Sequence, residues 1–281
     1  MPAFVLADGR VLAFETTGAP NGRPVVLFHG SPGSRLFSPD PAATAAAGVR
    51  LVTFDRPGYG RSDPLVDRRV ADSARDVAAL LDHLGIERAS LVGWSGGGPF
   101  AVATAHHAAD RVDRLALVSA PGPLDEVPGG WEALGEYQRP TAEMARREPH
   151  RSVRAIARHM TPFLADPPSF LGRGRGPDGE VMRGPAYPML VDQVHEALRQ
   201  GAVGIAADLV AMWLDWGFRL AAVTTPTTVF EGVHDRHNHE DAQCYAAGIP
   251  GAELVVWDDA GHLGVVAKWA GVLAAVVAAD A

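Results

Sequence analysis

Ser95 lies at the centre of the pentapeptide Gly-Trp-Ser-Gly-Gly at residues 93–97, between an apolar run at 89–94 and an Ala-rich segment at 100–109. The apolar run predicts a buried strand, and the Ala-rich segment predicts a helix. A tight turn between the two needs residues with almost no side chain two positions before and after the serine. Such a turn raises the hydroxyl above the sheet edge, where it could attack a carbonyl carbon. The backbone N–H of Gly96 would face the oxygen that becomes negative.

A serine hydroxyl is a weak nucleophile at neutral pH and needs a base that a third group orients. Asp235 and His262 are the candidates, since each lies in a loop directly after a predicted strand, 227–231 and 253–257. The carboxyl ends of parallel strands meet at one edge of a sheet, so three side chains that are distant in sequence can converge there. The pattern therefore predicts nucleophilic catalysis by a serine, a histidine and a carboxylate.

Three further carboxylates are alternative partners for His262. Asp258 and Asp259 are nearer to it in sequence, and Asp125 follows the predicted strand at 115–118. Because Asp258 and Asp259 precede a tight Ala-Gly turn, we expect them to be solvated or to cap the next helix. Asp235 is the favoured partner.

Three histidines, His234, His237 and His239, have a spacing typical of metal ligands. No matching set of cysteines or carboxylates accompanies them, so a solvated loop is the favoured interpretation. We expect no metal and no other cofactor. The single cysteine, Cys244, has no Gly-rich turn around it and is expected to be a small packing residue.

Tryptophans are the candidates for the wall of a substrate pocket. Trp94 flanks Ser95, while Trp213 and Trp216 lie in a predicted helix at 201–218. For all three, packing in the protein interior is the alternative to lining the pocket. In the loops nearby, we expect Asp55 and Arg56 to brace their neighbours through hydrogen bonds.

Buried strands alternate with helices over the first 120 residues, which predicts a parallel sheet covered on both faces. The alternation stops at about 121 and resumes at about 222. Between these points the sequence predicts helices at 131–148, 152–160, 188–199 and 201–218, and a mobile Gly-, Pro- and Arg-rich loop at 167–185. We therefore predict an α/β core domain at 1–122 and 221–281, with a helical cap inserted at 123–220 after the sixth strand.

The sequence resembles the α/β-hydrolase fold superfamily, among its small capped members with a serine nucleophile. The resemblance depends on five motifs in order: His-Gly-Ser-Pro-Gly at 29–33, Asp-Arg-Pro-Gly-Tyr-Gly-Arg-Ser at 55–62, the Ser95 pentapeptide, Gly-Val-His-Asp-Arg at 232–236 and Gly-His at 261–262. It implies a mostly parallel, eight-stranded sheet flanked by helices. It also implies that Ser95 is the nucleophile, His262 the general base and acid, and Asp235 its orienting carboxylate, with an oxyanion hole formed by the N–H groups of Ser31 and Gly96.

The sequence differs from two groups of related enzymes at motif positions, and these differences reduce the number of activities to consider. Similar epoxide hydrolases and haloalkane dehalogenases carry Asp where this chain has Ser95, and proline iminopeptidases carry His-Gly-Gly-Pro-Gly at the oxyanion loop. We therefore expect a serine hydrolase of an ester, a lactone or a related acyl compound. The alternatives are a receptor-like ligand-binding protein with little turnover, and a C–C hydrolase or perhydrolase that uses the same residues.

The composition limits the classes of binding partner that the protein could have. The formal net charge of −8 argues against nucleic acid and against an anionic membrane surface. The N-terminus has no signal-peptide pattern, and Lys268 interrupts the apolar segment at 263–279, which we expect to pack on the sheet. We expect a cytoplasmic protein that binds a small acyl substrate. The sequence leaves open whether the protein forms a homodimer.

Overall fold

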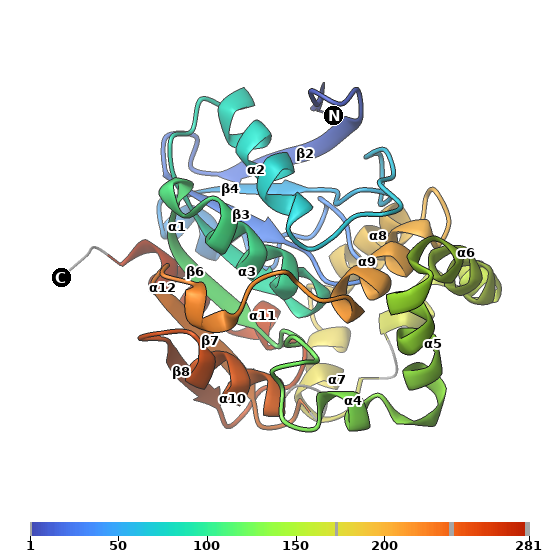
Figure 1. Ribbon diagram of the computed structural model, residues 1–281. Helices are drawn as coiled ribbons and strands as arrows, with labels where there is room; N and C mark the ends of the chain where they lie inside the picture. The colour runs from blue at the N-terminus through green and yellow to red at the C-terminus, as the bar shows by residue number, and fades with distance from the viewer. Residues whose placement is uncertain (1, 172–173, 236–238, 279–281) are drawn as a thin grey trace.

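The computed structural model describes residues 2–171, 174–235 and 239–278. Its eight strands form one sheet in the order β1-β2-β4-β3-β5-β6-β7-β8, in which β1, β2 and β4 pair antiparallel and the remaining neighbours pair in parallel. The predicted mostly parallel, eight-stranded sheet is confirmed (Figure 1). The strands are β1 (Ala3–Val5), β2 (Val11–Gly18), β3 (Arg23–Phe28), β4 (Val49–Phe54), β5 (Ala89–Trp94), β6 (Val112–Val118), β7 (Thr227–Gly232) and β8 (Glu253–Trp257).

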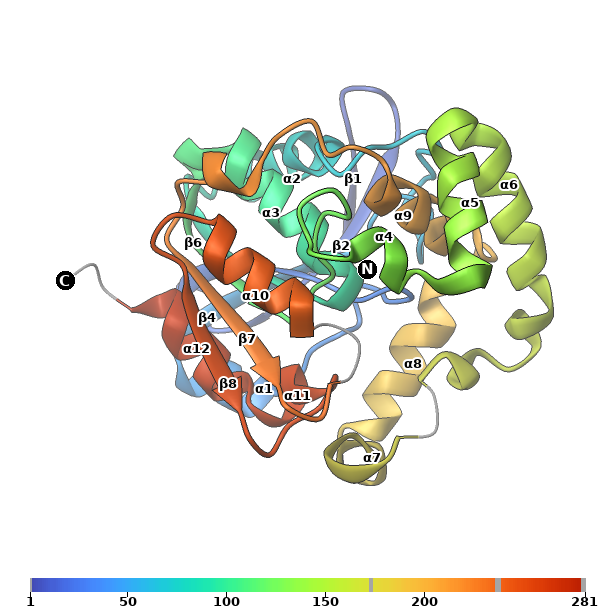
Figure 2. The same cartoon turned by 60° about the horizontal axis from the view of Figure 1, so that its bottom comes forward.

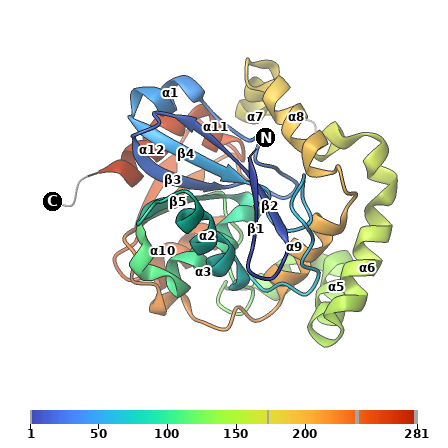
Figure 3. The ribbon, with the colours of Figure 1, turned by 90° about the horizontal axis from the view of Figure 1, so that it is seen from above.

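Helices cover both faces of the sheet, as the view along its edge in Figure 3 shows. One face carries α2 (Asp72–His83), α3 (Gly98–His107) and α10 (His239–Gly248), and the other carries α1 (Pro41–Ala46), α11 (Gly264–Ala267) and α12 (Trp269–Val277). The described part of the apolar segment at 263–279 therefore packs on the sheet as expected, and it forms two helices. None of the described helices has the length and apolar character that a membrane span requires.

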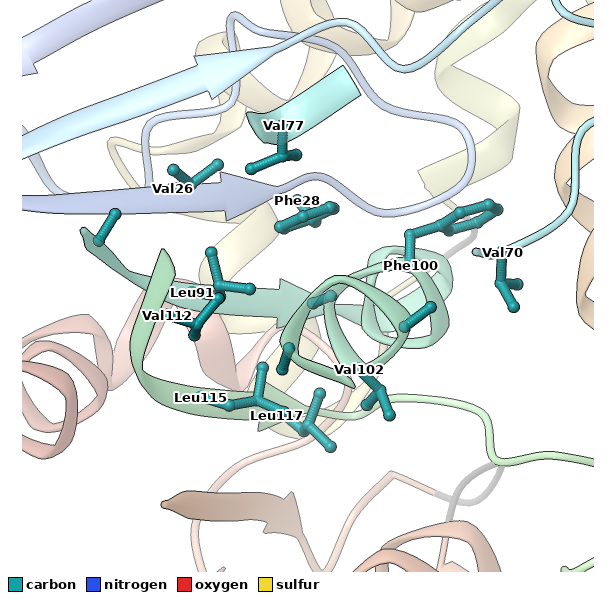
Figure 4. Close-up of a cluster of buried hydrophobic side chains, with 14 of the residues drawn as sticks. Val26, Phe28, Val70, Val77, Leu91, Phe100, Val102, Val112, Leu115 and Leu117 are labelled. Carbon is teal, nitrogen blue, oxygen red and sulfur yellow. The ribbon is translucent and has the colours of Figure 1, made fainter. Parts of the chain in front are cut away.

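The apolar run of β3 shows why both faces must be covered. Val26 and Phe28 pack in the cluster under α2 and α3, whereas Val25 and Leu27 pack in the cluster under α12. Successive side chains of a strand point to opposite faces, so an unbroken apolar run requires two apolar environments. Figure 4 shows the first cluster, where Val26 and Phe28 meet Val77 of α2.

Between β6 and β7 the described residues form helices and no strand. These helices are α4 (Gly130–Ala133), α5 (Gly135–Arg147), α6 (Pro149–Met160), α7 (Gly176–Arg183), α8 (Tyr187–Ala197) and α9 (Val203–Trp213). They lie together at one end of the sheet (Figure 2). The single helix predicted at 131–148 is divided at Gly135, whose φ of +64° belongs to the left-handed region.

The loop predicted at 167–185 is wrong for 176–183, because this stretch forms α7. Pro177 stands in the first turn of α7, where a helix does not need the missing N–H, and Asp178 places a negative charge near the helix N-terminus. The abundance of Gly and Pro in this stretch concealed a favourable helix start. Helix α7 is important for the candidate site because Asp178 contacts the backbone of His262.

Candidate active site

Ser95 lies in a strained turn at the end of β5. Its φ is +50°, in the left-handed region that residues other than glycine rarely adopt, and a short 3₁₀ turn at Ser95–Gly97 leads into α3. A Cβ on Gly93 would lie 2.7 Å from the Cα of Gly98, and a Cβ on Gly97 would collide with the carbonyl oxygen of Phe28. Both glycines are therefore needed for the close approach of strand and helix around the serine.

The structure brings together Ser95, His262 and Asp235. Nε2 of His262 is 2.9 Å from Oγ of Ser95, and Nδ1 of His262 is 2.8 Å from Oδ2 of Asp235. A carboxylate can only accept, so Nδ1 donates to Asp235 and Nε2 is left to accept the hydroxyl proton of Ser95. The Asp235 side chain is almost completely buried, while that of His262 is 32% exposed. This arrangement can remove a proton from the serine.

The other carboxylates considered as partners of His262 lie elsewhere. Asp125 accepts hydrogen bonds from Trp131 and Arg146, and Arg146 holds the pKa of this carboxyl below its ordinary value. Asp259 forms an exposed ion pair with Lys268 at 2.6 Å. Asp258 is exposed to solvent.

Ser31 and Gly96, the candidate oxyanion donors, lie side by side. A Cβ built on Gly96 would be 3.3 Å from the backbone nitrogen of Ser31 and would collide with its hydroxyl. Only glycine at position 96 permits this approach of the β3 loop to the serine turn. The loop that carries Ser31 thus lies against the serine turn, as an oxyanion hole formed by the two backbone amides would require.

The hydroxyl of Ser31 belongs to a buried network centred on Asp208 of α9. It donates to Oδ2 of Asp208 at 2.5 Å and accepts from Arg56 at 2.9 Å. Asp208 also accepts from Arg56 at 2.6 Å, from the hydroxyl of Tyr59 at 2.7 Å and from Arg68. The Ser31 side chain is thus held on the side of Asp208.

Sequence reasoning missed Asp208. Its side chain is completely buried, which by itself would raise the pKa, but Arg56 and Arg68 reverse this effect and hold the pKa of Asp208 well below its ordinary value. A signal was available, because Asp208 is the only charged residue in the apolar helix α9. An isolated charge on such a helix must find a buried partner.

The neighbouring loops are braced as expected. Nδ1 of His29 lies 2.7 Å from the carbonyl oxygen of Gly30, and burial together with Arg56 lowers the pKa of His29 well below its usual value. Asp55 accepts from the backbone nitrogens of Arg35 at 2.7 Å and Arg61 at 2.9 Å. These contacts fix the loops that follow β3 and β4.

A cavity of about 620 Å³ opens beside Ser95 and His262. Trp94 lines it and is also packed, since its ring stacks on Phe37 at 4.6 Å and its Nε1 donates to the carbonyl oxygen of His262 at 3.0 Å. Other apolar residues of the wall are Phe170, Leu171, Val194 and Leu263.

Trp213 and Trp216 do not line this cavity, and their assignment to its wall is corrected. Trp213 packs in the cluster formed by α5, α6 and α9, and Trp216 packs in the core under α3. The helix predicted at 201–218 is shorter in the structure, where α9 ends at Trp213, so Trp216 lies beyond it. The apolar pattern correctly indicated burial of both tryptophans, but it could not distinguish packing against other helices from packing against a pocket.

The predicted histidine group is only partly described. His237 lies outside the described residues, His234 borders the cavity, and Nδ1 of His239 forms a short contact with Glu231, which raises the pKa of His239. The described part of the chain assembles no group of three or more side chains able to ligate a metal.

A family model described as alpha/beta hydrolase fold matches residues 23–267. The chain belongs to this family and is a hydrolase of the α/β-hydrolase fold.

Several proteins that are similar to this chain over most of its length are named as hydrolases. A 2-hydroxy-6-oxononadienedioate/2-hydroxy-6-oxononatrienedioate hydrolase of Cupriavidus pinatubonensis is 32% identical, over 88% of this chain and 82% of the relative. Among solved structures, a hydrolase from Pseudomonas aeruginosa has a TM-score of 0.73 at 24% identity, over 99% of this chain and 98% of the other. An enol-lactonase from Burkholderia xenovorans has a TM-score of 0.68 at 24% identity, over 98% of each chain. These two structural likenesses show the fold.

Proposed function

We propose that this chain is a cofactor-independent serine hydrolase that cleaves an ester, a lactone or a related acyl bond of a small molecule. The observation that carries the proposal is the continuous hydrogen-bonded chain from Ser95 through His262 to Asp235, at 2.9 and 2.8 Å. The adjacent cavity offers a substrate space next to these three side chains.

In the proposed reaction, Oγ of Ser95 attacks the carbonyl carbon and its proton passes to Nε2 of His262. The carbonyl oxygen becomes negative and accepts hydrogen bonds from the N–H groups of Ser31 and Gly96. Asp235 stabilises the imidazolium, which then gives its proton to the leaving oxygen as the acyl bond breaks. A water molecule, deprotonated by His262, attacks the acyl-serine and releases the acid.

A second candidate is hydrolysis of a carbon–carbon bond, supported by the names of relatives at 30–32% identity. The compound in those names, 2-hydroxy-6-oxononadienedioate, contains a ketone and two carboxylates but no ester. Hydrolysis at the ketone carbon would break a carbon–carbon bond, and the leaving carbon would need a proton that His262 is placed to give.

Turnover of a panel of short para-nitrophenyl esters and lactones by the wild type and by Ser95→Ala tests the proposal. We expect the wild type to release product and the variant to lose activity by several powers of ten. Equal rates would refute the role of Ser95. A wild type that cleaves only vinylogous diketones would favour the second candidate, and one that binds ligands without turnover would favour a receptor-like protein.

A further inference from the structure

Gln193 combines a buried position with a place on the cavity wall. It lies on α8, its side chain is 0% exposed, and it borders the cavity that contains Ser95 and His262. Its Oε1 accepts a hydrogen bond from the backbone nitrogen of Ser34 at 3.2 Å. Ser34 follows the loop that carries Ser31, so one end of the Gln193 amide is fixed close to the candidate oxyanion site.

This contact settles which way the amide points. A backbone N–H can only donate, so the oxygen of the Gln193 amide must face Ser34 and the nitrogen must face away from it. Nε2 of Gln193 is buried and has no hydrogen-bond partner among the residues that the structure describes. A buried donor without an acceptor is unfavourable and uncommon in folded proteins.

Another glutamine of the same region shows that the fold can satisfy such a group. Nε2 of Gln200, seven positions further along the chain, donates to the carbonyl oxygens of Gly60 at 3.0 Å and Ser62 at 2.8 Å. Gln200 does not border the cavity. Of these two glutamines, the one whose Nε2 has no partner within the described part of the chain is the one that borders the cavity.

We propose that Nε2 of Gln193 donates a hydrogen bond to a second, uncharged oxygen of the substrate, distinct from the carbonyl oxygen that Ser31 and Gly96 would hold. The inference rests on the proposed hydrolase function and specifies its substrate class: acyl compounds that carry a further keto, hydroxyl or ether oxygen. The acceptor is uncharged because a neutral amide cannot compensate a carboxylate for its lost hydration. Among the residues that the structure describes, Arg175 is the one arginine that borders the cavity, and it is exposed to solvent.

Matched pairs of esters test this. The ratio of kcat/KM for para-nitrophenyl 5-oxohexanoate to that for para-nitrophenyl hexanoate measures the contribution of a keto oxygen in the acyl chain. The same ratio for methoxyethyl and butyl hexanoate measures an ether oxygen in the alcohol. We expect the wild type to prefer the oxygen-bearing member of at least one pair by about tenfold. Gln193→Met, which has a side chain of similar length but no donor, should bring that ratio close to one.

Gln200→Met is the matched control, because it removes a glutamine amide outside the cavity and should preserve the ratio. Melting temperatures establish that both variants are folded. No preference in the wild type for any oxygen-bearing ester, or a preference that survives Gln193→Met, would overturn the inference.

A binding measurement separates this inference from the proposed function. In Ser95→Ala, titration calorimetry compares the affinities of the two members of each pair without turnover. If the wild type cleaves no ester but Ser95→Ala still binds the keto compound more tightly through Gln193, the hydrolase proposal fails and the recognition by Gln193 stands. If esters are cleaved in a Ser95-dependent manner and neither ratio depends on Gln193, only the inference fails.

Discussion

Asp178 of α7 accepts a hydrogen bond from the backbone nitrogen of His262 at 3.1 Å. Its other carboxylate oxygen accepts from the backbone nitrogen of Leu263 at 2.9 Å. The carboxylate lies directly over Gly261, where a Cβ would be 2.6 Å from Oδ1. A residue from the helices between β6 and β7 thus holds the backbone from which the candidate base projects.

Asp178→Ala should lower kcat while KM changes little. The loss of both contacts frees the backbone at His262, and a small displacement of a catalytic group costs about ten- to a hundredfold in rate. Steady-state kinetics on the best ester and a melting curve measure the effect. Glu180→Ala, which removes an exposed carboxylate from the same helix, is the control. A normal kcat in Asp178→Ala would show that the His262 loop holds its position unaided.

Asp235→Asn should reduce kcat by about three to four powers of ten, because an amide cannot hold His262 in the tautomer that accepts the serine proton. The fold should persist, as circular dichroism would show. Asp259→Asn and Asp125→Asn, which change carboxylates bound to Lys268 and Arg146, should retain near-normal activity. Near-normal turnover by Asp235→Asn would remove this residue from the mechanism.

Asp208→Ala should destabilise the fold by about 3 to 5 kcal/mol, because it leaves Arg56 and Arg68 buried without their common partner. Urea unfolding at neutral pH measures the change. Asp113→Ala breaks an exposed ion pair with Arg88 and should cost less than about 1 kcal/mol. Similar losses in the two variants would mean that the buried network contributes no more than a surface pair.

Asp241 should make stability depend on pH. Burial raises the pKa of Asp241 to about 6, above the value of about 3.9 in an unfolded chain. The folded state therefore binds the proton of the Asp241 carboxyl more tightly than the unfolded state does. The resulting stabilisation is complete below about pH 4, is lost as the pH rises through about 6, and amounts to about 3 kcal/mol.

Asp241→Asn isolates this effect, since the amide oxygen can still accept from the backbone nitrogen of Gly122, now 2.8 Å from the carboxylate. The unfolding free energy of the variant minus that of the wild type should increase by about 3 kcal/mol between about pH 4 and pH 8. Urea titrations at several pH values provide the comparison. A difference that stays constant with pH would contradict the shifted pKa.

The sequence predicts the sheet and the positions of Ser95, Asp235 and His262 because their signals are local. An apolar run ends, a turn begins, and the polar residue after it must lie at the edge of the sheet. The contributions of Asp178 and Asp208 could not be predicted in this way. Each acts on a loop more than 80 residues away in sequence, and only the packing of α7 and α9 on the sheet defines the pairs.

Trp213 and Trp216 illustrate the same limit for apolar residues. Periodicity shows that a side chain is buried, but the neighbour that buries it depends on how separate helices pack. Gln193 is a further example. Its position in α8 gives no indication that one end of its amide has no partner among the described residues, because that depends on Ser34 and on the cavity.

The hydrogen bond that Ser31 donates to Asp208 of α9 has a consequence for protein engineering. One design is a chimera in which the helices between β6 and β7 are exchanged for those of a homologous enzyme in order to alter substrate choice. Here such an exchange would also remove a support of the loop expected to hold the developing negative charge. A hybrid would therefore react slowly even with compounds that both parents accept, unless an equivalent carboxylate were grafted with it.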